Sequence, residues 1–290
     1  MLITLENTQL KLTVDTLGAQ MMSLVKDGTE YLWQGDPTYW GERAPNLFPI
    51  IGRLCNGTYR YGGKTYQLGL HGFAKHGEFA VIEQGAEHMV LGISDSPATM
   101  ESYPFRFRFE IAYRLTGDTV ETTYRVRNQS EVTMPFAVGG HPGFHIPFAS
   151  GEKFEDYYLE FSEACQPDQI LFGPAALVSG QMPYKLENGQ RIRLSHALFD
   201  EEAIVLQHVC REVTLRSQKS NQFVRVSYPQ MSYLGLWHMP KTDAPYVCIE
   251  PWTSLPGRED TMEDFSCKSD FIYLEPGKTY ENQWTITIGE

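Results

Sequence analysis

The stretch AVGGHPGFHIP, residues 137–147, places His141 and His145 four residues apart. On a helix, two histidines at that spacing would supply half of a zinc site. Pro142 and Gly143 lie between them and prevent a helical turn. We therefore expect a rigid loop that fixes one orientation of His141, with glycines that let a ligand or another backbone approach closely. His145 is expected on the other side in a structural role, and a histidine satisfied by backbone groups is the alternative for His141.

The segment YVCIEPWTSLPG, residues 246–257, places a carboxylate among apolar and aromatic groups. As a strand, it puts Tyr246, Cys248, Glu250 and Trp252 on one face, and Pro251 is expected to end the strand. Partial desolvation would raise the basicity of Glu250, which suits a general base. A structural glutamate that binds the amides of the following turn explains the same pattern, and the segment alone supports both interpretations.

Two earlier segments, APNLFPIIGRL (44–54) and HGFAKHG (71–77), carry further polar groups beside glycine and proline turns. Arg53 follows a long apolar stretch, so we expect its charge to be carried inward to a carboxylate or a ligand hydroxyl. His71 is a further candidate hydrogen-bonding group. Lys75 and His76, taken alone, are predicted to be solvated loop charges.

The elements that must position these groups are strands. FRFRFEIAYRL (105–115) alternates apolar and polar residues, TGDT turns the chain, and VETTYRVRN alternates again, which predicts a hairpin. A second hairpin is predicted around Gly62 and Gly63. Further strand-like segments are KLTVD, FVRVSY, YLGLW, YVCIE and QWTITI, whereas the best helical candidate, EEAIVLQHV (201–209), fits a strand equally well. We predict one all-β domain over residues 1–290, built from two large packed antiparallel sheets.

Charge and missing motifs exclude several classes of function. The 290 residues carry a net charge of −12, which argues against nucleic acid or an anionic membrane as a partner. The chain has no phosphate-binding glycine loop, no dinucleotide fingerprint and no nucleophile elbow. The eight histidines do not have metal-ligand spacing, so no metal or other cofactor is expected. Cofactor-free acid/base chemistry or simple binding remains.

The cysteines and the N-terminus predict a cellular location. The five cysteines are scattered and form no C-x-x-C pair, which is typical of reduced thiols in the cytoplasm. The sequence has no recognisable signal peptide and no apolar stretch long enough to span a bilayer. We therefore predict a soluble cytoplasmic protein.

Taken together, these segments resemble the aldose 1-epimerase (galactose mutarotase-like) superfamily, above all its short branch of aldose 1-epimerase-like proteins from bacterial sugar operons. The resemblance spans the chain through an ordered set of motifs: NLFPIIGRL, LHGFAKHG, GGHPGFHIPF, LFDEEAIVL, LGLWHMP and YVCIEPWTSLPG. It implies a large antiparallel β-sandwich and an enzyme that interconverts the α and β anomers of a hexose without a cofactor.

The resemblance also implies catalytic roles. A protonated His141 would be the general acid directed at the ring oxygen, and Glu250 would be the general base that takes the proton of the anomeric hydroxyl. Arg53 and His71 would line the sugar site. Ring opening, rotation about the C1–C2 bond and reclosure then need only an acid and a base on different sides of the pyranose.

The remaining site residues are less sharply assigned. An acidic residue that binds a sugar hydroxyl corresponds to Glu202 or, as the weaker match, to Asp200. The indole of Trp237 or Trp252 could stack on the apolar face of the sugar, and either ring fits the core equally well.

The substrate stays open between a free aldose and a phosphosugar. Related hexose-6-phosphate mutarotases carry an arginine ahead of a PxxFP-like segment and another in HGFAR. Here Arg43 stands near the first at a different spacing, and Lys75 replaces the second. A non-catalytic carbohydrate-binding or sensing protein is the main rival, and a glycoside hydrolase ranks last because only Glu250 has a convincing context. The expected partner is a small sugar, and a homodimer is compatible with the sequence.

Overall fold

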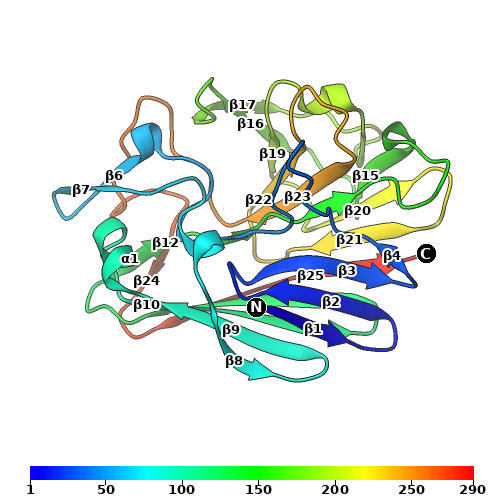
Figure 1. The fold of residues 1–290 in the computed structure, drawn as a ribbon. Helices are drawn as coiled ribbons and strands as arrows, with labels where there is room; N and C mark the ends of the chain where they lie inside the picture. Colours follow the sequence, from blue (N-terminus) through cyan, green and yellow to red (C-terminus); the bar gives the residue numbers. More distant parts are fainter.

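The computed structural model describes residues 1–290 and contains two large antiparallel sheets (Figure 1). The nine-stranded sheet has the order β18-β15-β20-β21-β25-β11-β10-β9-β8. Its strands are β8 (Ala80–Gln84), β9 (His88–Ser94), β10 (Phe107–Thr116), β11 (Thr119–Asn128), β15 (Tyr157–Phe161), β18 (Arg191–Arg193), β20 (Glu212–Ser217), β21 (Phe223–Ser227) and β25 (Thr279–Gly289).

The second large sheet has eight strands and holds the segments that the sequence singled out. Its order is β17-β16-β19-β22-β23-β13-β5, and β14 also pairs with β23. Its strands are β5 (Asn46–Leu47), β13 (Gly139–Gly140), β14 (Gly143–His145), β16 (Asp168–Phe172), β17 (Val178–Pro183), β19 (Ile204–Gln207), β22 (Tyr233–Trp237) and β23 (Tyr246–Trp252).

Smaller elements complete the fold. A four-stranded N-terminal sheet, drawn in dark blue in Figure 1, is formed by β1 (Leu2–Glu6), β2 (Leu10–Asp15), β3 (Gln20–Lys26) and β4 (Thr29–Glu30). Two further pairs are β6 (Thr58–Tyr61) with β7 (Lys64–Gln67), and β12 (Met134–Phe136) with β24 (Ile272–Leu274). The α-helix is α1 (Pro97–Ser102), and single 3-10 turns cover 55–57, 74–76, 154–156 and 196–199.

Period-two alternation explains the central hairpin. In β10 the residues at 107, 109, 111, 113 and 115 are fully or almost fully buried, whereas Arg108 and Arg114 are exposed. β10 pairs with β11 in register, and both predicted hairpins are confirmed, with Gly62 and Gly63 at φ 57° and 76°. These buried faces belong to one continuous core of 70 residues. The predicted all-β architecture with two large antiparallel sheets is confirmed.

Several local expectations were incomplete or wrong. The ambiguous segment 201–209 forms strand β19, because its apolar residues Ile204, Val205 and Leu206 are buried in the middle of the eight-stranded sheet. Pro251 does not end its strand, since β23 continues to Trp252 and Pro251 pairs with Leu234. The four-stranded sheet and α1, which begins with a capping box at Ser96, were not predicted. No helix is long and apolar enough to cross a membrane.

Candidate active site

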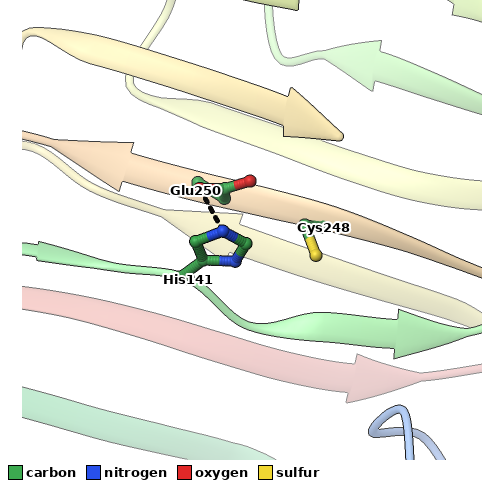
Figure 2. Close-up of side chains that lie close together, drawn as sticks. All are labelled: His141, Cys248 and Glu250. Atoms are coloured by element: carbon green, nitrogen blue, oxygen red, sulfur yellow. Dashed lines mark ion pairs between the residues drawn. The ribbon is translucent and has the colours of Figure 1, made fainter. Parts of the chain in front are cut away.

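The pairing register brings His141 and Glu250 together. β23 pairs on one side with the segment 139–145, in which Gly139 lies opposite Trp252 and Gly143 lies opposite Cys248. By this antiparallel register His141, midway between the two glycines, lies opposite Glu250. Side chains in such cross-strand positions are in contact distance. The imidazole Nε2 lies 3.1 Å from Oε2 of Glu250. Figure 2 shows the two side chains facing each other.

On its other side, β23 pairs with β22, and the residue opposite Glu250 is Gly235. A Cβ atom at Gly235 would lie 2.9 Å from Cζ2 of Trp252 and 3.2 Å from Cβ of Glu250. Because Gly235 has no side chain, the Trp252 indole can pack against it, next to Glu250.

The glycines around His141 also accommodate indole rings. A Cβ atom at Gly139 would lie 2.8 Å from Cδ1 of Trp252, one at Gly140 would lie 2.7 Å from Cζ2 of Trp284, and one at Gly143 would lie 3.0 Å from Cζ3 of Trp40. The predicted close approach of another backbone is found at Gly139, where a Cβ would lie 3.0 Å from the carbonyl oxygen of Pro251. Aromatic side chains, which were not predicted there, also pack around the histidine loop.

The loop that carries His141 is held by backbone hydrogen bonds. The amide of His141 donates to the carbonyl of Pro45 at 3.0 Å, and the amide of Gly143 donates to the carbonyl of Arg43 at 2.8 Å. The carbonyl of Pro142 accepts from the amide of Ile249 at 3.1 Å. These contacts on both flanks fix the backbone of the loop that carries His141.

Burial sets the protonation of the His141–Glu250 pair. The side chains are 11 % and 2 % exposed, respectively. Burial lowers the pKa of His141 to about 3 and raises the pKa of Glu250 well above its usual range. Burial therefore disfavours the charged form of both groups, and the neutral imidazole is the favoured form of His141 near neutral pH. The dry environment disfavours a standing imidazolium, so the general-acid role expected of His141 stays a prediction that requires a proton supplied during the reaction.

The polar atoms of the pair lack other partners. Oε2 of Glu250 and Nδ1 of His141 have no hydrogen-bond partner in the protein. The 3.1 Å contact between Oε2 and Nε2 is thus a close approach without hydrogen-bond alignment. Buried polar groups in proteins are nearly always hydrogen-bonded, so unsatisfied atoms at this position indicate a place where a ligand completes the bonding.

The structural alternative for Glu250 is contradicted by the hydrogen bonds of the following turn. The amide of Thr253 donates to Val138, the amide of Leu255 to Oδ2 of Asp270, and the amide of Gly257 to Arg53. Asp270, rather than Glu250, binds the turn.

A cavity of about 320 Å³ opens over the pair. Three indole rings contribute to its wall, those of Trp40, Trp237 and Trp252. The ring of Trp40 lies 4.9 Å from that of His141 at 31°, and the ring of Trp237 lies 5.8 Å from His141 at 81°. The cavity is lined by Trp40, Glu42, Gly52, Arg53, Leu70, His71, His141, Phe172, Ala176, Glu202, Ala203, Trp237, Glu250, Trp252 and Pro256.

His71 lines this cavity with a fixed tautomer. Its Nδ1 accepts a hydrogen bond from the amide of Gly52 at 3.0 Å, and its own amide donates to the Gly52 carbonyl at 2.8 Å. Because Nδ1 is an acceptor, the ring proton is on Nε2. Burial lowers the pKa of His71 well below its usual range, and the neighbouring His141, Lys75 and Arg53 lower it further. His71 is thus a neutral hydrogen-bond donor, 5.5 Å from the His141 ring.

The cationic candidates are placed differently from one another. Arg53 lines the cavity, is exposed and makes no ion pair with a protein carboxylate, so of its two expected partners the ligand hydroxyl stays a prediction. Lys75 is absent from the lining, and its side chain is only 8 % exposed. Its Nζ lies 3.0 Å and 3.1 Å from the two carboxylate oxygens of Glu42, so it is not the solvated charge predicted from its loop. Arg43 donates to the carbonyl of Met22 and to Oε1 of Gln34.

The two acidic candidates, Glu202 and Asp200, lie in different surroundings. Glu202 lines the cavity, whereas Asp200 accepts a hydrogen bond from the amide of Lys241 at 3.1 Å. His145 is absent from the lining and lies opposite Tyr246 in the strand register, and its structural role stays a prediction. Sequence reasoning missed Trp40 and Glu42, which lie in an irregular loop without periodicity or motif.

Comparison with known proteins gives the family. A model of the aldose 1-epimerase family matches residues 1–286. The chain belongs to the aldose 1-epimerase family. Protein LacX (chromosomal) of Lactococcus lactis subsp. lactis is 36 % identical over 99 % of both chains.

Solved structures of this family are similar over the full length. A galactose mutarotase-related enzyme from Lactobacillus acidophilus has a TM-score of 0.95 and 35 % identity, covering 100 % of this chain and 98 % of its own. A galactose mutarotase-like protein from Lactobacillus casei has a TM-score of 0.92 and 28 % identity, with both chains covered completely. The fold and the family predicted from the motifs are confirmed.

Proposed function

We propose that this aldose 1-epimerase family member is a mutarotase that interconverts the α and β anomers of an unphosphorylated hexose by general acid/base catalysis. The observation that carries the proposal is the buried His141–Glu250 pair, with its 3.1 Å contact, in the wall of an aromatic-lined cavity. Mutarotation moves one proton from the anomeric hydroxyl and one to the ring oxygen, which leaves the enzyme with the same number of protons at the end.

The 3.1 Å contact supplies a route to the reactive form of the pair. A small rotation of the ring aligns Nε2 with Oε2, and the carboxyl proton passes from Glu250 to His141. The products of this transfer are a carboxylate and an imidazolium. Glu250 then accepts the proton of the anomeric hydroxyl, and His141 donates a proton to the ring oxygen. The pair acts as one unit, rather than as an acid and a base on separate walls.

The other lining residues suit a polyhydroxylated ring. Nε2–H of His71 and the free guanidinium of Arg53 donate hydrogen bonds, and the carboxylate of Glu202 accepts them. Trp40 and Trp237 offer aromatic faces to the C–H groups of the sugar. These groups recognise hydroxyls and an apolar ring face together, which is the chemistry of a monosaccharide.

The charges favour a substrate without a phosphate group. Lys75 is neutralised by Glu42, and Arg43 is bound to a carbonyl and an amide oxygen, so neither is free to bind a phosphate. Arg53 is the one unpaired cation in the lining, and the carboxylate of Glu202 lies in the same cavity. A dianionic phosphate would therefore enter a site with no net positive charge.

The proposal is tested by polarimetry of freshly dissolved α-D-galactose and α-D-glucose with the wild-type protein and with Glu250→Gln. Wild type should accelerate the approach to anomeric equilibrium, and the variant should lose this acceleration while still binding sugar. Sugar binding without any acceleration by wild type would indicate a carbohydrate-binding protein. Acceleration confined to hexose 6-phosphates would contradict the substrate assignment.

A further inference from the structure

We infer that His141, Cys248 and Glu250 together form an inhibitory binding site for a zinc-like divalent metal ion. One donor atom from each residue, a ring nitrogen, a thiol sulfur and a carboxyl oxygen, lies within 4.8 Å of the other two. All three side chains are buried. Figure 2 shows that Cys248 and Glu250 project from β23 beside the imidazole of His141.

The strand register explains why these donors converge. Cys248 and Glu250 are two residues apart on β23 and therefore share one face of the sheet. His141 lies opposite Glu250, and the residue opposite Cys248 on the same side is Gly143. Gly143 carries no side chain, and the ring of Trp40 packs against it. The eight histidines have no metal-ligand spacing in the sequence, so this cluster exists only through pairing across strands.

The donor set matches a borderline-soft ion. Zinc in proteins is bound by cysteine sulfur, histidine nitrogen and carboxylate oxygen, and three protein ligands with one open position are a recurring arrangement. Tetrahedral bonds of those lengths place donor atoms about 3.5 Å apart, so side-chain rotations of modest size convert the present cluster into a binding site. Magnesium and calcium, which prefer oxygen ligands, are disfavoured by the sulfur and nitrogen.

Unsatisfied atoms provide a second, independent indication of a ligand. Oε2 of Glu250 and Nδ1 of His141 are buried without hydrogen-bond partners, and His141 and Glu250 also line the open cavity. A metal ion can therefore reach two donors from the cavity and take the sulfur as the third. Binding forms the metal–sulfur, metal–nitrogen and metal–oxygen bonds and releases the proton of the Cys248 thiol and that of the Glu250 carboxyl group to solvent.

The claim that the bound ion inhibits the protein rests on the proposed mutarotase function. A bound ion occupies the lone pairs and displaces the proton that mutarotation needs, so it should inhibit the enzyme. Metal binding itself is independent of any catalytic activity. The two claims can therefore fail separately.

The experiment uses Co²⁺ and Zn²⁺ as probes of the full-length protein. Co²⁺ bound to a thiolate has a sulfur-to-metal charge-transfer absorption, which wild type should develop on titration. Cys248→Ser should lose this absorption, whereas Cys267→Ser, which alters an exposed thiol, should keep it. Zn²⁺ competition against Co²⁺ gives the affinity, and the loss of one ligand should weaken it by about tenfold or more.

Activity is the second readout. Zn²⁺ should slow mutarotation by wild type and by Cys267→Ser, and chelation by EDTA should restore the rate. Cys248→Ser lies outside the cavity lining, so it should turn over and resist Zn²⁺. Thermal unfolding shows whether the variant is folded, and Cys248→Ala serves as a replacement if the serine variant is not. Absence of thiolate absorption in wild type, or equal absorption in wild type and the folded Cys248 variant, would overturn the site.

Discussion

Acid destabilisation that depends on His141 is the most quantitative consequence of the buried pair. The pKa of this histidine is about 3 in the folded protein because burial disfavours the imidazolium. In the unfolded chain the group has its ordinary pKa near 6.5. The unfolded state therefore binds a proton at mildly acidic pH when the folded state does not. The contribution of His141 to stability is complete above pH 6.5 and is lost as the pH falls toward the folded value.

The size of the lost stability follows from the difference between the folded and unfolded pKa values of His141. Each pH unit between the two pKa values removes about 1.4 kcal/mol, so lowering the pH from 7 to 4 should remove about 3 kcal/mol through this group. The raised pKa of Glu250 acts in the opposite direction above its unfolded value, because the folded state then retains a proton that the unfolded chain has lost. That contribution is common to wild type and a His141 variant, so it cancels in the comparison.

The assay is urea unfolding of wild type and His141→Gln at pH 7 and pH 4. Glutamine keeps a polar side chain but cannot titrate, so the variant should lose about 3 kcal/mol less than wild type over this interval. His76→Gln changes an exposed histidine and should keep the wild-type dependence on pH. An equal loss in wild type and His141→Gln would refute the neutral, buried state of His141 and with it the resting form of the pair.

Two further predictions concern the shape and the charge of the cavity. Gly235→Ala should lower kcat/KM, because its Cβ would lie 2.9 Å from the Trp252 indole and displace that ring toward the sugar site. Steady-state polarimetry measures this change. The matched control is Gly180→Ala, whose Cβ would have its nearest neighbour at 3.8 Å and should leave kcat/KM unchanged. Arg53→Ala should raise KM for the free hexose. Lys75→Met should not selectively raise KM for a hexose 6-phosphate, because Lys75 is bound to Glu42. A KM increase for the phosphosugar alone in Lys75→Met would contradict the assignment of an unphosphorylated substrate.

The sequence predicted the strands better than their pairing. The alternation in residues 105–128 is local, and it gave the β10–β11 hairpin and its buried face correctly. The pairing of β13 and β14 with β23 joins segments more than a hundred residues apart, and no local pattern encodes that register. The types of His141 and Glu250 indicated acid/base chemistry, but their contact and their burial depend on the register of strands far apart in the sequence.

The same reasoning explains which other residues of the candidate site were found. Arg53, His71, Glu202 and Trp237 came from family motifs, and all four line the cavity. Lys75 came from a motif as well, but its ion pair with a carboxylate in a distant loop removes it from the lining. Trp40 reaches the cavity from an irregular segment whose position is set by packing against Gly143, and residue type alone gives no signal for such a contact.

The central claim is that His141 and Glu250 catalyse anomer interconversion as a pair. Exchange NMR between the two anomeric protons of an equilibrated hexose measures this directly, with wild type, Glu250→Gln, His141→Gln and the double variant. Each single variant should lose about 10²–10⁴ in rate, equivalent to about 3–5 kcal/mol, and the double variant should lose little more than either one, because the two groups work as a unit. Exchange at the wild-type rate in either single variant, or losses that add fully in the double variant, would contradict catalysis by His141 and Glu250 as a pair.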